Sequence, residues 1–139
     1  MRNFISYKKS LEILGDIVLS EQSTEKLFIT NAIGRVIAKD IIANHNSPEF
    51  PTSAMDGYAI KYADMKNNSI EIIDKNPAGS IIEKEVLIST CIKTFTGSLM
   101  PKGSDTLIPI ENVEVINNQI KITKEVPFGF AVREIGENY

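Results

Sequence analysis

Branching at Cβ is the dominant feature of this sequence. Of its 139 residues, 37 are Ile, Thr or Val, and 22 Ile stand against only 7 Leu. Branching at Cβ restricts the first side-chain torsion, so these residues fit a pleated strand better than a helix. The bulk of the chain is therefore predicted to be strand. At this length it forms one domain, or one domain with an appendage.

The first 44 residues are predicted to form a helix and a connector. Ser6 can cap a helix over about residues 6–20, where apolar residues recur at steps of three and four. Residues 26–29 are typical of a short strand, residues 30–34 of a turn closed by Gly34, and residues 35–42 of an extended segment. Residues 1–44 are too few to bury a core of their own.

The residue composition of the chain changes at Asn44. Residues 44–57 form a long loop with two prolines, and loops of this length are usually functional or disordered. Short strands are predicted after it, at residues 58–60, 70–73, 91–96, 105–110, 113–116 and 119–123, the last two joined by a hairpin at Asn117 and Asn118. We therefore expect a mainly β chain with an N-terminal α-helix. Residues 45–139 would form a small, irregular β domain of the sandwich or barrel type.

Composition excludes several classes of protein. A net charge of −3 argues against non-specific nucleic-acid binding, which needs an excess of Lys and Arg. No apolar run is long enough to span a membrane, and the N-terminus lacks the apolar core of a signal peptide. The single cysteine, Cys91, fits a reducing cytoplasm and is expected to pack as a small apolar residue in a strand. The single histidine, His45, has no partner at metal-ligand spacing, so a zinc site is not expected.

Three segments carry candidate chemistry. Asp56-Gly57 alone is ordinary turn chemistry, but a proline-bounded loop can hold the Asp56 carboxylate outward, where it can bind Mg²⁺ or accept a proton. Thr96-Gly97 can offer backbone N–H groups and a hydroxyl to an anion, although on its own this segment is better explained as a hairpin turn. Residues 133–138 have mixed charge, which usually marks a solvated face.

Taken together, these segments resemble the N-terminal region of the MoeA family, the molybdopterin molybdenumtransferases, a fold also found in the gephyrin E domain. The resemblance depends on three stretches in the right order: PEFPTSAMDGYAI at residues 48–60, TGSLMPKGSDT at residues 96–106 followed by Glu111, and REIGE at residues 133–137.

The resemblance implies an enzyme that inserts molybdate into adenylylated molybdopterin with Mg²⁺ and releases AMP, in molybdenum cofactor biosynthesis. It implies a homodimer whose active site is shared between subunits, with a molybdopterin-adenylylating protein as pathway partner. By motif position Asp56 is the essential carboxylate and a possible Mg²⁺ ligand. The substrate-binding residues would be Ser53, Thr96, Gly97, Arg133, Glu137 and Asn138.

One departure concerns Asn138, which stands where the family usually has Asp. An amide cannot ionise, so a metal or proton role at Asn138 is weakened. The α/β domain that such an enzyme needs for molybdopterin lies outside this sequence, and we expect no turnover from the chain on its own. The alternative is a non-catalytic interaction or dimerisation module derived from the same family.

Overall fold

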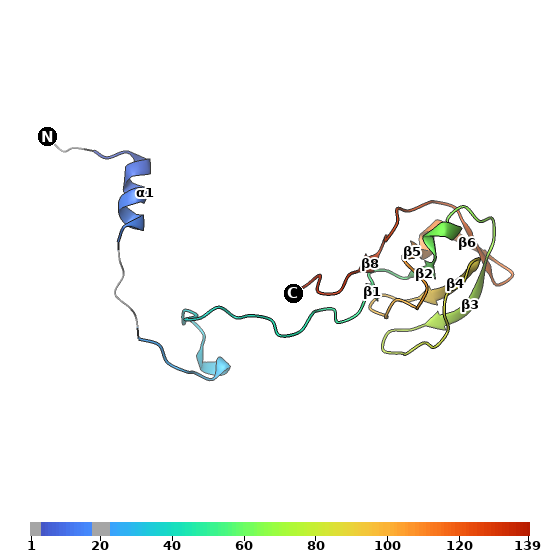
Figure 1. Cartoon of the computed structure of the whole chain (residues 1–139), viewed down its shortest axis with the longest axis horizontal. Coiled ribbons are helices and arrows are strands. Elements are labelled where there is room, and N and C mark those ends of the chain that lie inside the picture. The colour runs from blue at the N-terminus through green and yellow to red at the C-terminus, as the bar shows by residue number, and fades with distance from the viewer. Residues whose placement is uncertain (1–3, 18–22) are drawn as a thin grey trace. The chain divides into compact units, whose positions relative to one another are not determined.

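The computed structural model describes residues 4–17 and 23–139, and these fall into two compact units (Figure 1). The first unit extends to Ile42 and the second comprises Ala43–Tyr139. In the described residues the chain is mainly β with one α-helix, as the sequence predicts.

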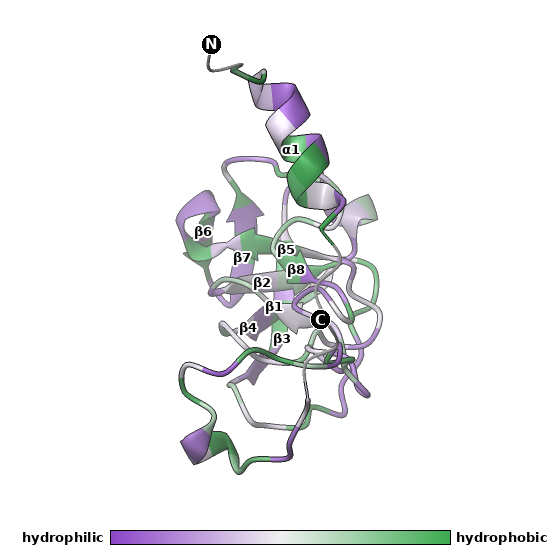
Figure 2. Ribbon diagram, turned by 90° about the vertical axis from the view of Figure 1, so that its left-hand side faces the viewer, coloured by the Kyte–Doolittle hydropathy of each residue, from purple (hydrophilic) through white to green (hydrophobic). Residues whose placement is uncertain are grey.

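The α-helix, α1 (Tyr7–Gly15), begins where it is predicted. The hydroxyl of Ser6 accepts a hydrogen bond from the backbone N–H of Lys9 at 3.2 Å and so caps the first turn. The helix is shorter than predicted, because it ends at Gly15, a poor helix former. Residues 18–20, which are also predicted to be helical, lie outside the described residues. Both hydrophilic and hydrophobic residues occur along α1 (Figure 2), and its side chains are not buried. No helix in residues 4–17 and 23–139 is long and apolar enough to cross a membrane.

The connector differs from its prediction at residues 26–29. They form no strand, and a short 3₁₀-helix, Ile29–Asn31, follows Phe28 instead. A strand needs a neighbour to pair with, and the described part of this unit offers none. The turn at Gly34 is confirmed, since Gly34 adopts a φ of +78°.

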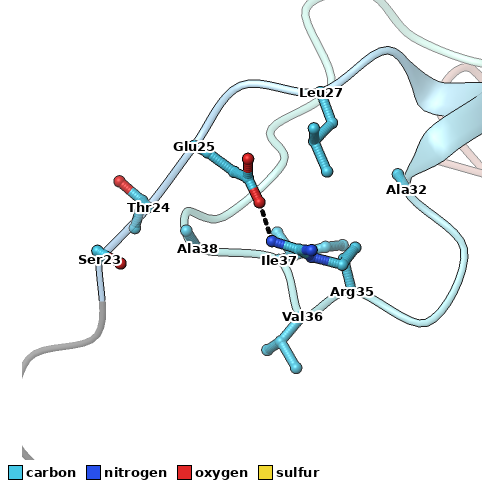
Figure 3. A pocket seen from close by; sticks show the side chains of 9 residues that line it. All are labelled: Ser23, Thr24, Glu25, Leu27, Ala32, Arg35, Val36, Ile37 and Ala38. Atoms are coloured by element: carbon cyan, nitrogen blue, oxygen red, sulfur yellow. Dashed lines mark hydrogen bonds and ion pairs between the residues drawn. The ribbon is translucent and has the colours of Figure 1, made fainter.

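A hollow of about 710 Å³ lies within the connector (Figure 3). Its lining residues come from residues 23–38, and an ion pair between Glu25 and Arg35 crosses it. Both side chains of this pair are more than half exposed. The hollow is therefore formed by an exposed bend of the connector, and we do not regard it as a candidate site.

The second unit is built on a six-stranded sheet with the order β5-β2-β4-β3-β7-β6. Its strands are β2 (Gly57–Ile60), β3 (Ile70–Asn76), β4 (Thr90–Thr94), β5 (Thr106–Pro109), β6 (Val113–Ile116) and β7 (Gln119–Ile122). All neighbours are antiparallel except β3 and β4. The hairpin at Asn117 and Asn118 is confirmed, with φ values of 47° and 63° that suit a type I′ turn.

The sheet curls on itself around the core. Its two edge strands, β5 and β6, are joined only by the 3₁₀-helix Ile110–Asn112, so the edges must approach each other. The core takes side chains from five of the six strands and from two segments outside them: Tyr58, Ile60, Ile70, Cys91, Ile108 and Ile120 lie in strands, and Met65 and Val126 do not. Cys91 is fully buried in β4, as expected, and burial raises the pKa of its thiol to about 12.

A second, two-stranded sheet joins the long loop to the end of the chain. Strand β1 (Thr52–Ser53) pairs antiparallel with β8 (Val132–Arg133). Neither strand is predicted from the sequence, because two-residue strands carry no alternation that a pattern can detect. Beyond β8, the N–H of Asn138 donates to the carbonyl of Ser47 at 2.8 Å, and the N–H of Ser47 donates to that of Tyr139 at 2.8 Å. The last residues therefore run beside residues 46–48.

Candidate functional site

Strand register brings Asp56 and Thr96 together across 40 positions of sequence. Asp56 immediately precedes β2 and Thr96 follows β4, and these two strands pair antiparallel with Gly57 opposite Thr94. The residue before β2 therefore lies beside the residues after β4. Asp56 Oδ1 accepts hydrogen bonds from the backbone N–H of Thr96 at 2.8 Å and from its hydroxyl at 2.7 Å.

Thr96 is presented by a tight turn. The N–H of Ser98 donates to the carbonyl of Phe95 at 3.0 Å, and Gly97 at the third position has a φ of +81°. This is the pattern of a type II turn, which requires positive φ at its third residue and so selects glycine. The turn leaves Thr96 and Gly97 exposed and aims the donors of Thr96 at the carboxylate.

The carboxylate of Asp56 is exposed and is held by a distant residue rather than by its own turn. The backbone hydrogen bond from Thr96, and then that from its hydroxyl, lower the pKa of Asp56 from its ordinary value of 3.8, with a smaller contribution from the charge of Lys93. Among the described residues no group donates a hydrogen bond to Oδ2. Asp56 is therefore ionised at neutral pH and presents one oxygen outward.

This lowered pKa predicts how stability depends on pH. A depressed pKa in the folded state stabilises the fold above the unfolded pKa, and the stabilisation is lost as the pH falls through the folded value. Asp56→Asn has no such titration. We expect the free energies of unfolding of the two proteins to converge as the pH falls from 5 to below the ordinary 3.8 of Asp56. Urea denaturation at several pH values measures this, and a constant difference would contradict it.

Ser53 and the loop before Asp56 contact the same turn. The N–H of Ser53 donates to the carbonyl of Ser98 and the N–H of Gly97 donates to that of Ser53, both at 2.8 Å. Ser53 is buried, and its hydroxyl donates to the carbonyl of Met55. The structure thus brings Ser53, Asp56, Thr96 and Gly97 into one place.

The candidate residues of the third segment, residues 133–138, do not lie together. Arg133 lies opposite Thr52 in the β1–β8 pair and is therefore beside the loop that leads to Asp56. Its side chain is exposed and makes no ion pair within residues 4–17 and 23–139.

Glu137 and Asn138 are placed differently. Glu137 accepts a hydrogen bond from the N–H of Glu134 at 3.1 Å, and the amide of Asn138 donates to the hydroxyl of Ser47 at 3.2 Å. These contacts hold them to the chain's last turn and to residues 46–48, and in the described part of the chain neither side chain hydrogen-bonds to Asp56.

Lys93 is a site residue that the sequence does not reveal. It lies in β4, and its ammonium lies 5.5 Å from the centre of the Phe95 ring, close enough for a cation–π interaction. Its charge lowers the pKa of Asp56. No motif marks Lys93, and only the register of β2 against β4 brings it near the carboxylate.

A metal ion here would have few ligands from this chain. No group of three or more His, Cys, Asp or Glu side chains in the described part of the chain could enclose a metal. Asp56 Oδ2 nevertheless suits Mg²⁺, which is commonly bound by one or two carboxylates together with substrate phosphates and water. His45 is exposed, and its ring makes a T-shaped pair with that of Tyr139, with the ring centroids 6.0 Å apart.

Comparison with known proteins gives a consistent result. The family model described as "MoeA N-terminal region (domain I and II)" matches residues 5–139. The molybdopterin molybdenumtransferase of Haemophilus influenzae is 32% identical over 117 residues, which cover 83% of this chain, and that of a Nostoc species is 33% identical over 109 residues, covering 74%. The crystal structure of the molybdopterin biosynthesis moeA protein from Pyrococcus horikoshii OT3 covers 98% of this chain with a TM-score of 0.78 and 31% identity.

The chain is much shorter than these proteins. Its matched part spans 29% of the Haemophilus protein, 25% of the Nostoc protein and 38% of the Pyrococcus chain.

Proposed function

The chain belongs to the MoeA family through its N-terminal region, and on this basis we propose that it forms the N-terminal part of a molybdopterin molybdenumtransferase. The proposed reaction inserts molybdate into adenylylated molybdopterin and releases AMP, in molybdenum cofactor biosynthesis. The observation that carries the proposal is the exposed Asp56 carboxylate, fixed through one oxygen by Thr96 and open at the other. The proteins that share this region are named for the transferase activity.

We propose that Asp56 acts as a ligand rather than as a proton acceptor. Molybdate and the phosphates of the substrate are anions, so a bare carboxylate repels them. Mg²⁺, when bound, would supply the positive charge that reconciles the two. Thr96 keeps Asp56 ionised and directs Oδ2 outward. The lowered pKa of Asp56 supports this role, since a general base works best with a pKa near the working pH.

The remaining candidate residues would bind the substrates around Asp56. The guanidinium of Arg133 is a suitable partner for molybdate or phosphate oxygens. The N–H groups of Thr96 and Gly97 already donate to Asp56 and to Ser53, so this turn would shape the site rather than donate to an anion, while Ser53 orders the loop beside it. Glu137 and Asn138 would line the edge of the site. We propose that other parts of the enzyme supply most of the molybdopterin contacts, so that the chain alone has no turnover.

A chimera tests the proposed function. This chain replaces the matching N-terminal region of the Haemophilus influenzae transferase, and the purified chimera is assayed for molybdate-dependent release of AMP from adenylylated molybdopterin. We expect turnover that depends on Mg²⁺. A chimera that folds and assembles but releases no AMP would overturn the proposal and favour the non-catalytic interaction module.

We also propose that the protein works as a homodimer and that the first unit contributes to its interface. Apolar side chains on this unit are strongly exposed, among them Leu11, Leu14, Ile33 and Val36, and such surfaces commonly mark protein contacts. A chimera with Leu11→Lys and Leu14→Lys that keeps the dimeric mass in sedimentation equilibrium would exclude this role for the helix.

We propose that the pathway partner is a molybdopterin-adenylylating protein, because the substrate is adenylylated. We place the reaction in the cytoplasm, where a buried thiol such as Cys91 stays reduced.

A further inference from the structure

We infer that Asn76 is a positioning residue for the Asp56–Thr96 pair, acting through the turn at residues 95–99. The inference rests on the proposed function only for its kinetic consequence, since its structural part concerns contacts within this chain. Asn76 does not touch Asp56, and it belongs to none of the motifs that mark the site in the sequence.

The side chain of Asn76 is buried, and both ends of its amide are paired. Asn76 is the last residue of β3 and is 1% exposed. Its amide nitrogen donates to the carbonyl of Leu99 at 2.7 Å, and its amide oxygen accepts from the hydroxyl of Ser80 at 3.1 Å. A buried amide with both ends paired holds its partners in one arrangement, because breaking either bond leaves a polar atom without water.

The backbone of Asn76 holds the other end of the turn. Its carbonyl accepts hydrogen bonds from the hydroxyl of Ser98 at 2.8 Å and from the N–H of Phe95 at 3.3 Å. Ser98 is itself 1% exposed, so this hydroxyl is as enclosed as the amide. One residue of β3 therefore binds the turn at Phe95, Ser98 and Leu99, on both sides of Thr96-Gly97.

The same turn holds the carboxylate of Asp56 and part of the loop before it. Thr96 supplies both hydrogen bonds to Oδ1, and Gly97 and Ser98 bind the backbone of Ser53, three residues before Asp56. Displacing the turn would move the Thr96 donors away from the carboxylate and loosen the loop that carries it. Sites whose supporting residues are lost typically suffer 10- to 100-fold losses in affinity or activity.

The test compares Asn76→Ala and Ser98→Ala with a matched control, Asn67→Ala. Asn67 also uses its amide for two hydrogen bonds, to Asp64 at 2.7 Å and Ser89 at 3.1 Å, but neither partner belongs to the Asp56 site. The measurement is amide hydrogen exchange of Thr96 by NMR in the 139-residue chain. We expect exchange about tenfold faster in Asn76→Ala and in Ser98→Ala, and unchanged in Asn67→Ala.

Unchanged exchange of Thr96 in a folded Asn76→Ala protein, or equal acceleration in Asn67→Ala, would overturn the inference. If Asn76→Ala does not fold, Ser98→Ala tests the inference at the Asn76 carbonyl instead, because the lost hydroxyl donates there, and unchanged exchange of Thr96 in it would overturn the inference. In the chimera, Asn76→Ala should lower kcat about tenfold relative to Asn67→Ala, with little change in KM. An inactive parent chimera would defeat the proposed function and leave the exchange result standing. Faster exchange without a fall in kcat in an active chimera would defeat the positioning role.

Discussion

Replacing Asp56 by alanine is expected to lower the molybdate-dependent release of AMP by the chimera at least about 100-fold, the low end of what a single essential catalytic group contributes. The side chain is exposed, and its only hydrogen-bond partner in the described part of the chain is Thr96, so its loss should leave the fold intact. Asp56→Asn keeps an oxygen that can accept the bonds from Thr96 but removes the charge. If Asp56 acts as a ligand through its charge, Asp56→Asn should be nearly as inactive as Asp56→Ala.

Asp74 offers the matched control for this experiment. Like Asp56, it is an aspartate whose pKa is lowered by hydrogen bonds, from the N–H of Lys75 and the ammonium of Lys84. It lies on β3, and in the described part of the chain its carboxylate pairs with Lys75 and Lys84, neither of which is a candidate site residue. Asp74→Ala should keep the rate of the parent chimera. Equal turnover in Asp56→Ala and Asp74→Ala would remove Asp56 from the mechanism.

Gly57→Ala is expected to lower the free energy of unfolding by about 3 kcal/mol, the upper end of what overpacking usually costs. A Cβ on Gly57 would lie 2.3 Å from the carbonyl oxygen of Ile108 and 2.9 Å from both its carbonyl carbon and Leu107 Cγ. Two of these three atoms are backbone of β5, which pairs directly with β2, so they cannot move without breaking the sheet. Glycine is therefore needed at position 57, directly after Asp56, because β2 and β5 lie too close together for a side chain.

Urea denaturation of the chain measures this effect, and Gly79→Ala is its control. Gly79 has a φ of +80° and open space around its Cβ position, so only the backbone conformation is penalised, by about 1 kcal/mol. A Gly57→Ala protein no less stable than Gly79→Ala would show that β5 can shift to accommodate the added Cβ. It would also mean that the close approach of β2 and β5 is not what selects glycine.

The sequence predicts the elements with strong local signals. Ser6 marks the start of α1, and Asn117 and Asn118 mark the hairpin, because capping and positive φ are local properties. The strand predicted at residues 26–29 is wrong, because their composition suits a strand but the described chain offers them no strand to pair with. The pairing of β1 with β8 joins residues that are 79 and 81 positions apart and has no local signature.

The site divides in the same way. The motif around Asp56 is recognisable by resemblance, and so is Thr96. Their contact depends on the register of β2 against β4, which no single segment specifies. Lys93 and Asn76 enter the site only through that register and through the turn at residues 95–99, so they are found from the structure alone.

The burial of Cys91 makes the protein convenient to label. Because its thiol is fully enclosed and its pKa is raised to about 12, it will not react with maleimide under native conditions. A cysteine introduced at an exposed hairpin position such as Ile116 would then be the sole reactive thiol. A dye attached there could report assembly of the protein without any need to delete the native cysteine.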